Sequence, residues 1–162
     1  MTVNNLKELM VEGLKDLYDA EKQVSEALPK MTKEAKAPAL REAFEEHLSQ
    51  TRAQIRRLEK VFQALNVSDR KKECKGMQAI IHEGEEMMKE ASDSTVRDAA
   101  LISAAQHVEH YEMAGYGTVV AYAQHLDHND VADELQKSLN EEKLTDLKLS
   151  QLAEMKVNAK AT

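Results

Sequence analysis

Four long segments of the sequence repeat apolar side chains at the three- and four-residue spacing of an amphipathic α-helix. The first of these stripes consists of Leu6, Met10, Leu14, Leu17, Glu21, Val24 and Leu28. Turn-forming residues are scarce: the chain has only 5 Gly and 2 Pro, which argues against a β architecture with many turns. The pattern therefore predicts an all-α fold with a core of aliphatic side chains.

Caps and helix breakers give the expected boundaries. The first helix is predicted to begin after Asn4 or Asn5, both good N-caps, and to run to about Ala35, with a disturbance at Pro29. Pro38 suits the first turn of the second helix. The other predicted helices span residues 38–65, 75–91, 95–126 and 131–156, and the helix over 75–91 is the short one.

The order of these helices predicts the architecture. Two long helices are followed by a long crossover that contains the short fifth helix, and then by two more long helices. Such a crossover makes the second and third long helices parallel neighbours, which is the ferritin-like form of the four-helix bundle. We therefore expect one domain over residues 1–156 and a flexible C-terminal tail over residues 157–162.

Polar side chains interrupt each apolar stripe near the middle of its helix. At about 100° per residue, Glu21, His47 and Glu142 fall at the centres of their stripes, and Glu109 shares its face with Glu112. The full inward set is Glu21, His47, Gln50, Glu109, Glu112, Glu142 and Asp146. Because a buried, unpaired carboxylate is costly, the same interruption on four helices at the same height predicts a shared cation.

A metal centre is the interpretation that best accounts for this set. Its five carboxylates would repel one another and take up protons if no cation were present. Two divalent ions would neutralise most of the charge, and oxygen ligands with one imidazole suit Fe first, or Mn, with Zn as a substitute. Taken singly, an inward Glu is more often a paired or rim residue, and an inward His is more often a satisfied core residue. The coincidence across four helices favours the metal centre, with Glu112 or Asp146 as ligands or as partners of ligands.

The rest of the sequence argues against several other classes of protein. A net charge of −7 without a concentrated basic cluster disfavours nucleic-acid binding. The absence of a long apolar run and of a signal-peptide pattern leads us to expect a cytoplasmic protein without a membrane span. A single cysteine, Cys74, excludes an internal disulfide and fits a reducing compartment. The pairs His107–His110 and His125–His128 lack carboxylate support on the same face, so solvated or capping roles are expected for them.

Several strings of the sequence are typical of one family. They are YDAEKQ (18–23), HLSQT (47–51), VRDAALISAAQHVEHYE (96–112), GYGT (115–118) and NEEKLTDLKL (140–149). Over about residues 5–155 the chain resembles the YciE/YciF family of ferritin-like bacterial stress proteins. The resemblance implies a ferritin-like bundle, a homodimer, a dinuclear metal site and an association with stress responses, but no defined enzymatic activity.

The resemblance also implies a ligand set, and the sequence departs once from the family and once from the wider class of di-iron bundles. The inward residues of the family map onto Glu21, His47, Glu109, Glu112, Glu142 and Asp146. Relatives often have Glu where this chain has Gln50, and a neutral amide implies weaker metal binding on that side. The Glu-x-x-His motif, with which di-iron bundles supply two ligands from one helix, does not occur in this sequence. An oxygenase or ferroxidase mechanism is therefore not implied.

These observations lead to one main functional hypothesis and two others. The first is a stress-associated protein that binds two divalent metal ions, with a redox role toward O₂ or peroxide. The alternative is a non-enzymatic dimeric scaffold, in which the buried acids are protonated or hydrogen-bonded to one another. Iron storage would need a hollow shell of many subunits, for which the sequence gives no evidence.

Overall fold

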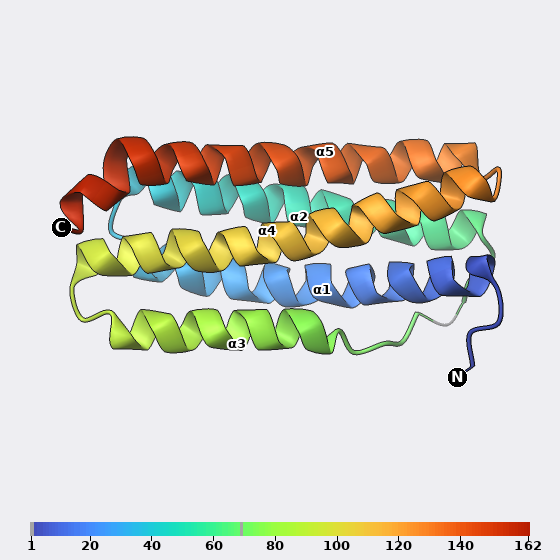
Figure 1. Ribbon diagram of the computed structural model, residues 1–162, viewed down its shortest axis with the longest axis horizontal. Helices are drawn as coiled ribbons and strands as arrows, with labels where there is room; N and C mark the ends of the chain where they lie inside the picture. The colour runs from blue at the N-terminus through green and yellow to red at the C-terminus, as the bar shows by residue number, and fades with distance from the viewer. Residues whose placement is uncertain (1, 69) are drawn as a thin grey trace.

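The structure, a computed structural model, describes residues 2–68 and 70–162 and contains five α-helices in this part of the chain (Figure 1). They are α1 (Leu6–Glu34), α2 (Pro38–Ala64), α3 (Lys75–Glu90), α4 (Ser94–His125) and α5 (Asn129–Leu152). The predicted all-α class and the predicted short helix in the crossover are both confirmed. None of these helices combines the length and the hydropathy that a bilayer span requires.

The four long helices α1, α2, α4 and α5 lie side by side, and α3 packs on the outside against α1 and α4 (Figure 1). Helices α2 and α4 run in the same direction, as predicted from the crossover. The expectation that they are neighbours is wrong, because each packs against both α1 and α5 and the two lie diagonally across the bundle. The crossover passes over the side of α1, so α4 enters the bundle next to α1 rather than next to α2.

The predicted boundaries of the first helix are confirmed, and those at the C-terminal end of the chain differ in detail. Asn5 caps α1 by accepting a hydrogen bond from the backbone N–H of Glu8 at 2.9 Å, and α1 continues past Pro29. At the other end α5 stops at Leu152, before the predicted end, and the chain continues as a π-helical turn over Ala153–Val157. Val157, the first residue of the predicted tail, is buried and packs in the core.

A buried aspartate on α4 fixes the connection between α1 and α2. The carboxylate of Asp98 accepts hydrogen bonds from the backbone N–H groups of Lys36 at 2.7 Å and of Ala37 at 2.8 Å. These donors lie at the start of α2, where backbone N–H groups have no partner within the helix. Asp98 thus links the turn between α1 and α2 to helix α4.

Replacing Asp98 is expected to destabilise the fold without affecting the bundle centre. In Asp98→Ala both N–H groups lose their acceptor, and we expect a loss of about 2–3 kcal/mol in the free energy of unfolding. Asp98→Asn retains one acceptor oxygen and should lose less. Urea denaturation measures both values, with the exposed Asp133→Ala as a control near zero; equal stability of Asp98→Ala and wild type would contradict the capping role.

The apolar core consists of two clusters, one toward each end of the bundle. The first contains Val24, Leu28, Phe44, Leu101 and Leu149, and the second contains Met10, Leu14, Leu58, Phe62, Val119 and Leu135. On α2, α4 and α5 buried polar residues separate the residues of one cluster from those of the other, and on α1 Glu21 lies close to the boundary between the clusters. The predicted inward polar residues therefore lie in a layer at the middle of the bundle.

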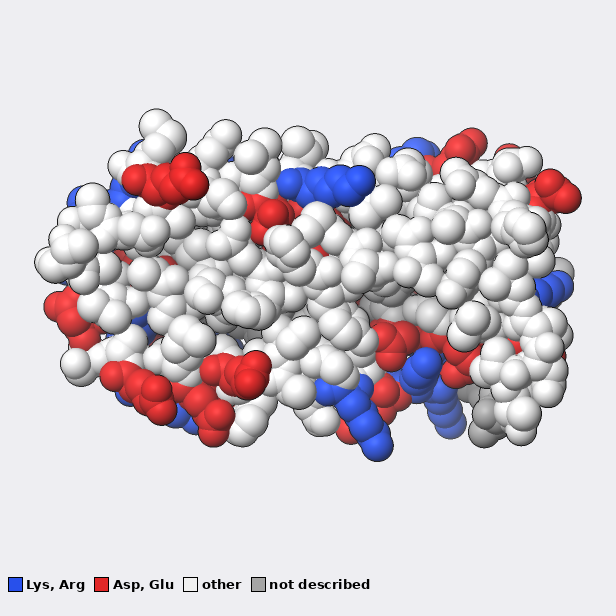
Figure 2. Space-filling view, in the orientation of Figure 1, with Lys and Arg blue, Asp and Glu red and all other residues white. Residues whose placement is uncertain are grey.

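Charged side chains lie at the surface in mixed groups. On the face drawn in Figure 2, acidic and basic side chains alternate along the rims, and uncharged surface occupies much of the centre. The ion pairs Lys72–Asp16 and Arg97–Glu34 are examples that link neighbouring elements. Such exposed pairs contribute little to stability, so the packing of the helices must come from the two apolar clusters.

Candidate metal centre

Five titratable side chains of the middle layer are buried almost completely. Glu21, Glu109, Glu112 and Glu142 are each 0% exposed, and His47 is 2% exposed. Except for Glu21, each of them offers one ligand atom, and these four atoms all lie within 4.8 Å of one another. Helices α2, α4 and α5 thus bring one imidazole and three carboxylates together, which we call the His47 cluster.

The atoms of the His47 cluster are close, but they do not satisfy one another. His47 Nδ1 lies 3.1 Å from Glu109 Oε1, and His47 Nε2 lies 3.8 Å from Glu142 Oε2. Neither contact has hydrogen-bond geometry, and both imidazole nitrogens, all four oxygens of Glu109 and Glu112, and Glu142 Oε2 have no hydrogen-bond partner. Buried polar atoms are nearly always paired in folded proteins. This concentration of unpaired donor atoms fits a site for a cation.

The electrostatic environment points in the same direction. Burial is the main cause that raises the pKa of Glu21, of Glu109 and of Glu112 well above the ordinary range. Neighbouring acids add to the shift, chiefly Glu142 at Glu21 and Glu109, and Glu21 at Glu112. Burial lowers the pKa of His47, and the nearby Glu142 opposes this effect only in part. A neutral imidazole is the form that coordinates a metal, and a divalent ion beside the acids would stabilise their charged forms.

Glu21 lies next to the cluster, on α1. Its Oε1 accepts a hydrogen bond from the hydroxyl of Tyr116 at 2.5 Å, while its Oε2 has no partner. The charge of Glu142 contributes to the raised pKa of Glu21, so Glu21 interacts electrostatically with the His47 cluster. Tyr116 orients one oxygen and leaves the other free, as expected for a residue that holds a ligand in position.

Besides Glu21, two predicted ligands lie outside the His47 cluster. Gln50 is half-buried, and its Oε1 accepts a hydrogen bond from the hydroxyl of Thr145 at 3.1 Å. Asp146 is also half-buried; its Oδ1 accepts a hydrogen bond from Gln106 at 3.1 Å and lies 3.3 Å from Nε2 of His110. Their angular offsets on α2 and α5 turn these side chains toward the seams between helices instead of the bundle axis. Their prediction as metal ligands is therefore not supported by the geometry.

Sequence reasoning missed one residue of the layer, Gln54. This side chain is fully buried on α2, two turns after His47, and its Nε2 donates hydrogen bonds to Glu142 Oε1 and to Glu141 Oε2. Its amide therefore fixes one oxygen of Glu142 and leaves the other facing the cluster. The helical angle of Gln54 lies within about 20° of that of His47, which was the signal available in the sequence.

A second line of polar contacts supports Glu142 from outside. Arg57 forms a bidentate ion pair with Glu141, with N–O distances of 2.9 Å and 3.0 Å, and also donates to the hydroxyl of Ser138 at 2.7 Å. Glu141 in turn accepts from Gln54 at 3.0 Å. Helices α2 and α5 are thus joined by a chain of hydrogen bonds that ends at a candidate ligand, the kind of support that metal ligands usually have.

Known proteins share both the sequence and the fold of this chain. A family described as a domain of unknown function, DUF892, matches residues 5–162. Protein YciF of Escherichia coli K12 is 40% identical over 162 residues, which cover 99% of this chain and 98% of that protein. The crystal structure of the E. coli stress protein YciF matches with a TM-score of 0.92 and 39% identity, covering 96% of this chain and 99% of that one.

A second solved structure is similarly close. YcfI of Rhodopseudomonas palustris, provisionally described as a structural protein, matches with a TM-score of 0.89 and 40% identity, covering 91% of this chain and 94% of that one. These matches extend over nearly the whole chain and confirm the resemblance drawn from the sequence strings. The chain therefore belongs to the DUF892 family, the family of the stress protein YciF.

Proposed function

We propose that this protein binds divalent metal ions in the middle layer of its bundle. The observation that carries the proposal is the set of buried ligand atoms without hydrogen-bond partners on His47, Glu109, Glu112 and Glu142. Together with Glu21, the layer holds four carboxylates, and two divalent cations would balance their four negative charges. Charge balance therefore favours a dinuclear centre.

The residues of the centre would have different roles. His47 would supply the nitrogen ligand, and Glu109, Glu112 and Glu142 would supply oxygen ligands to the first ion. Glu21, held by Tyr116, would contribute its free oxygen to the second. This oxygen-rich donor set suits Fe or Mn, with Zn as a substitute. Bound Fe or Mn would supply redox chemistry toward a small oxidant, which agrees with the stress-protein description of the YciF relative.

Metal analysis tests the proposal directly. Protein purified without chelator, or reloaded anaerobically with Fe(II) or Mn(II), is expected to contain two ions per chain by elemental analysis. Glu142→Gln should lose much of this content, because an amide is a weaker ligand than a carboxylate. Asp146→Asn is the matched control on the same helix and should retain it. Absence of metal in the reloaded wild type, or equal metal loss in both variants, would sink the proposal.

A scaffold without an obligatory metal is the second candidate. Two hydrogen bonds, from Tyr116 to Glu21 and from Gln54 to Glu142, already satisfy part of the layer, and protonated acids would need no cation. The description of the R. palustris relative as structural points the same way.

For either function we propose a homodimer, supported by the exposed apolar side chains Leu144, Leu147 and Met155 on one side of α5 and the following turn. Light scattering would measure the dimer.

A further inference from the structure

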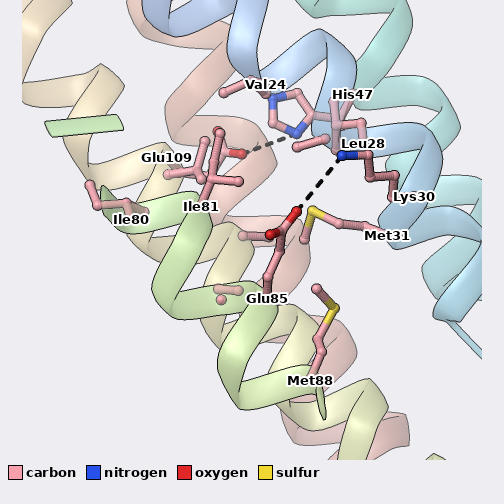
Figure 3. A pocket seen from close by; sticks show the side chains of 15 residues that line it. Val24, Leu28, Lys30, Met31, His47, Ile80, Ile81, Glu85, Met88 and Glu109 are labelled. Atoms are coloured by element: carbon pink, nitrogen blue, oxygen red, sulfur yellow. Dashed lines mark ion pairs between the residues drawn. The ribbon is translucent and has the colours of Figure 1, made fainter. Parts of the chain in front are cut away.

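An apolar cavity lies between α3 and the bundle and reaches the candidate metal centre. Its volume is about 30 Å³, and its walls include Val24, Leu28, Met31, Ile81, Met88 and Val108. Helix α3 supplies one wall and α1 and α4 supply most of the others, while α2 contributes His47; Figure 3 labels side chains from α1 and α3 and, at the buried end, His47 and Glu109. The cavity is therefore a product of the packing of the crossover helix on the bundle.

Polar groups occur at two places in this lining. His47 and Glu109, both members of the His47 cluster, line the buried part. Lys30 and Glu85 lie at the protein surface and form an ion pair with an N–O distance of 3.8 Å, with side chains 73% and 36% exposed (Figure 3). The cavity thus extends from an exposed ion pair between α1 and α3 to the imidazole of the candidate metal centre.

The polarity of the cavity lining determines which small molecules can bind there. A cavity of this size has room for a molecule of one or two heavy atoms, and an ordered water needs two to four polar partners. Aliphatic and thioether groups form most of the lining and offer no such partners, so a water could be held only at the two polar ends, by His47 and Glu109 or by Lys30 and Glu85. Hydrogen peroxide and hydrated ions would lose their hydrogen bonds on entering, whereas a neutral apolar diatomic molecule loses nothing comparable.

We propose that this cavity binds dioxygen and leads it to the His47 and Glu109 side of the metal centre. The destination rests on the proposed function, but binding of the gas does not, because it depends only on the cavity. Helix α3 closes the outer side by a close approach to α4, since a Cβ atom at Gly84 would lie 2.9 Å from Cβ of Ala104. The crossover helix would thus complete the apolar stretch of the cavity between its two polar ends, and a small apolar molecule would lose no hydrogen bonds there.

Xenon is a suitable probe, because it binds in apolar cavities, as shown for an engineered one of about 150 Å³. Crystals of the metal-free protein under xenon pressure are expected to show an anomalous peak in the cavity. Ala105→Leu, in the wall on α4, should abolish the peak, and Ile81→Trp should do so from α3, outside the four-helix core. Ala123→Leu, a buried position of the other core cluster on α4, is the control for overpacking and should retain the peak. A wild-type cavity without xenon, or a peak that persists in both filled variants, would overturn the proposal.

A kinetic comparison separates this inference from the proposed function. With Fe(II) loaded, Ala105→Leu and Ile81→Trp should retain their metal content but react several-fold more slowly with dioxygen than Ala123→Leu does. Equal rates would exclude the cavity as the route. If no metal binds, the proposed function fails by elemental analysis, while the xenon result still decides whether the cavity takes an apolar gas.

Discussion

Adding Fe(II) or Mn(II) to the metal-free protein is expected to raise its melting temperature by about 5–10 °C. An ion that binds only the folded chain adds about 2.7 kcal/mol to the free energy of unfolding at a concentration 100-fold above its dissociation constant. For a chain of this size, 1 kcal/mol corresponds to about 2–4 °C. The ion would do this by giving partners to the unpaired atoms of His47, Glu109, Glu112 and Glu142. Differential scanning calorimetry under anaerobic conditions measures the shift.

Variants of the His47 cluster test whether its residues bind the ion that raises the melting temperature. The double variant Glu109→Gln/Glu142→Gln should lose the metal-induced shift, because two charged ligands are replaced by amides. Gln50→Ala and Asp146→Asn should retain it, since both residues lie in the seams between helices and bond to other side chains. A metal-free double variant that melts at or above the wild-type temperature, with no metal effect in either protein, would favour the scaffold function.

The stability of the metal-free protein is expected to fall as the pH rises above about 4.3, the pKa of glutamate in an unfolded chain. Glu21, Glu109 and Glu112 have raised pKa values in the folded state, so the folded chain holds their protons over a range where the unfolded chain has released them. Their contribution is fully present below that pH and is lost as the pH passes through the raised values. His47 acts oppositely: its lowered pKa makes the folded chain more stable as the pH rises toward about 6.5. Because three acids lower the free energy of unfolding as the pH rises and one imidazole raises it, we expect the free energy of unfolding to fall overall.

The measurement is urea denaturation between pH 5 and 8, in chelator and in excess metal. A carboxyl group whose pKa differs by one between the folded and unfolded chain changes the free energy of unfolding by about 1.4 kcal/mol. Glu112→Gln removes one titrating group and should flatten the metal-free profile. With metal bound the slope should reverse, because ligands must lose their protons to coordinate. Identical profiles for the wild type and Glu112→Gln would show that Glu112 is not forced toward its neutral form.

The inward positions were largely predictable, and the ligand set was only partly so. Helical angles placed Glu21, His47, Glu109, Glu112 and Glu142 on the buried faces, and the burial of all five is confirmed. Metal binding by these residues stays a prediction. The angles could not place residues near the edge of a face, because a modest rotation decides whether a side chain points to the bundle axis or to a seam. Gln50 and Asp146 lie outside the His47 cluster for that reason, and Gln54 was overlooked.

The periodicity of each segment determined which side of its helix is buried, because that property depends only on residues close in the sequence. The tertiary structure decided which sides meet. It placed α2 and α4 diagonally, brought Glu142 of α5 to His47 of α2, and set α3 against the bundle so that an apolar cavity reaches the centre. Those relations depend on how helices distant in the sequence fill space together, and no pattern along one helix contains that information.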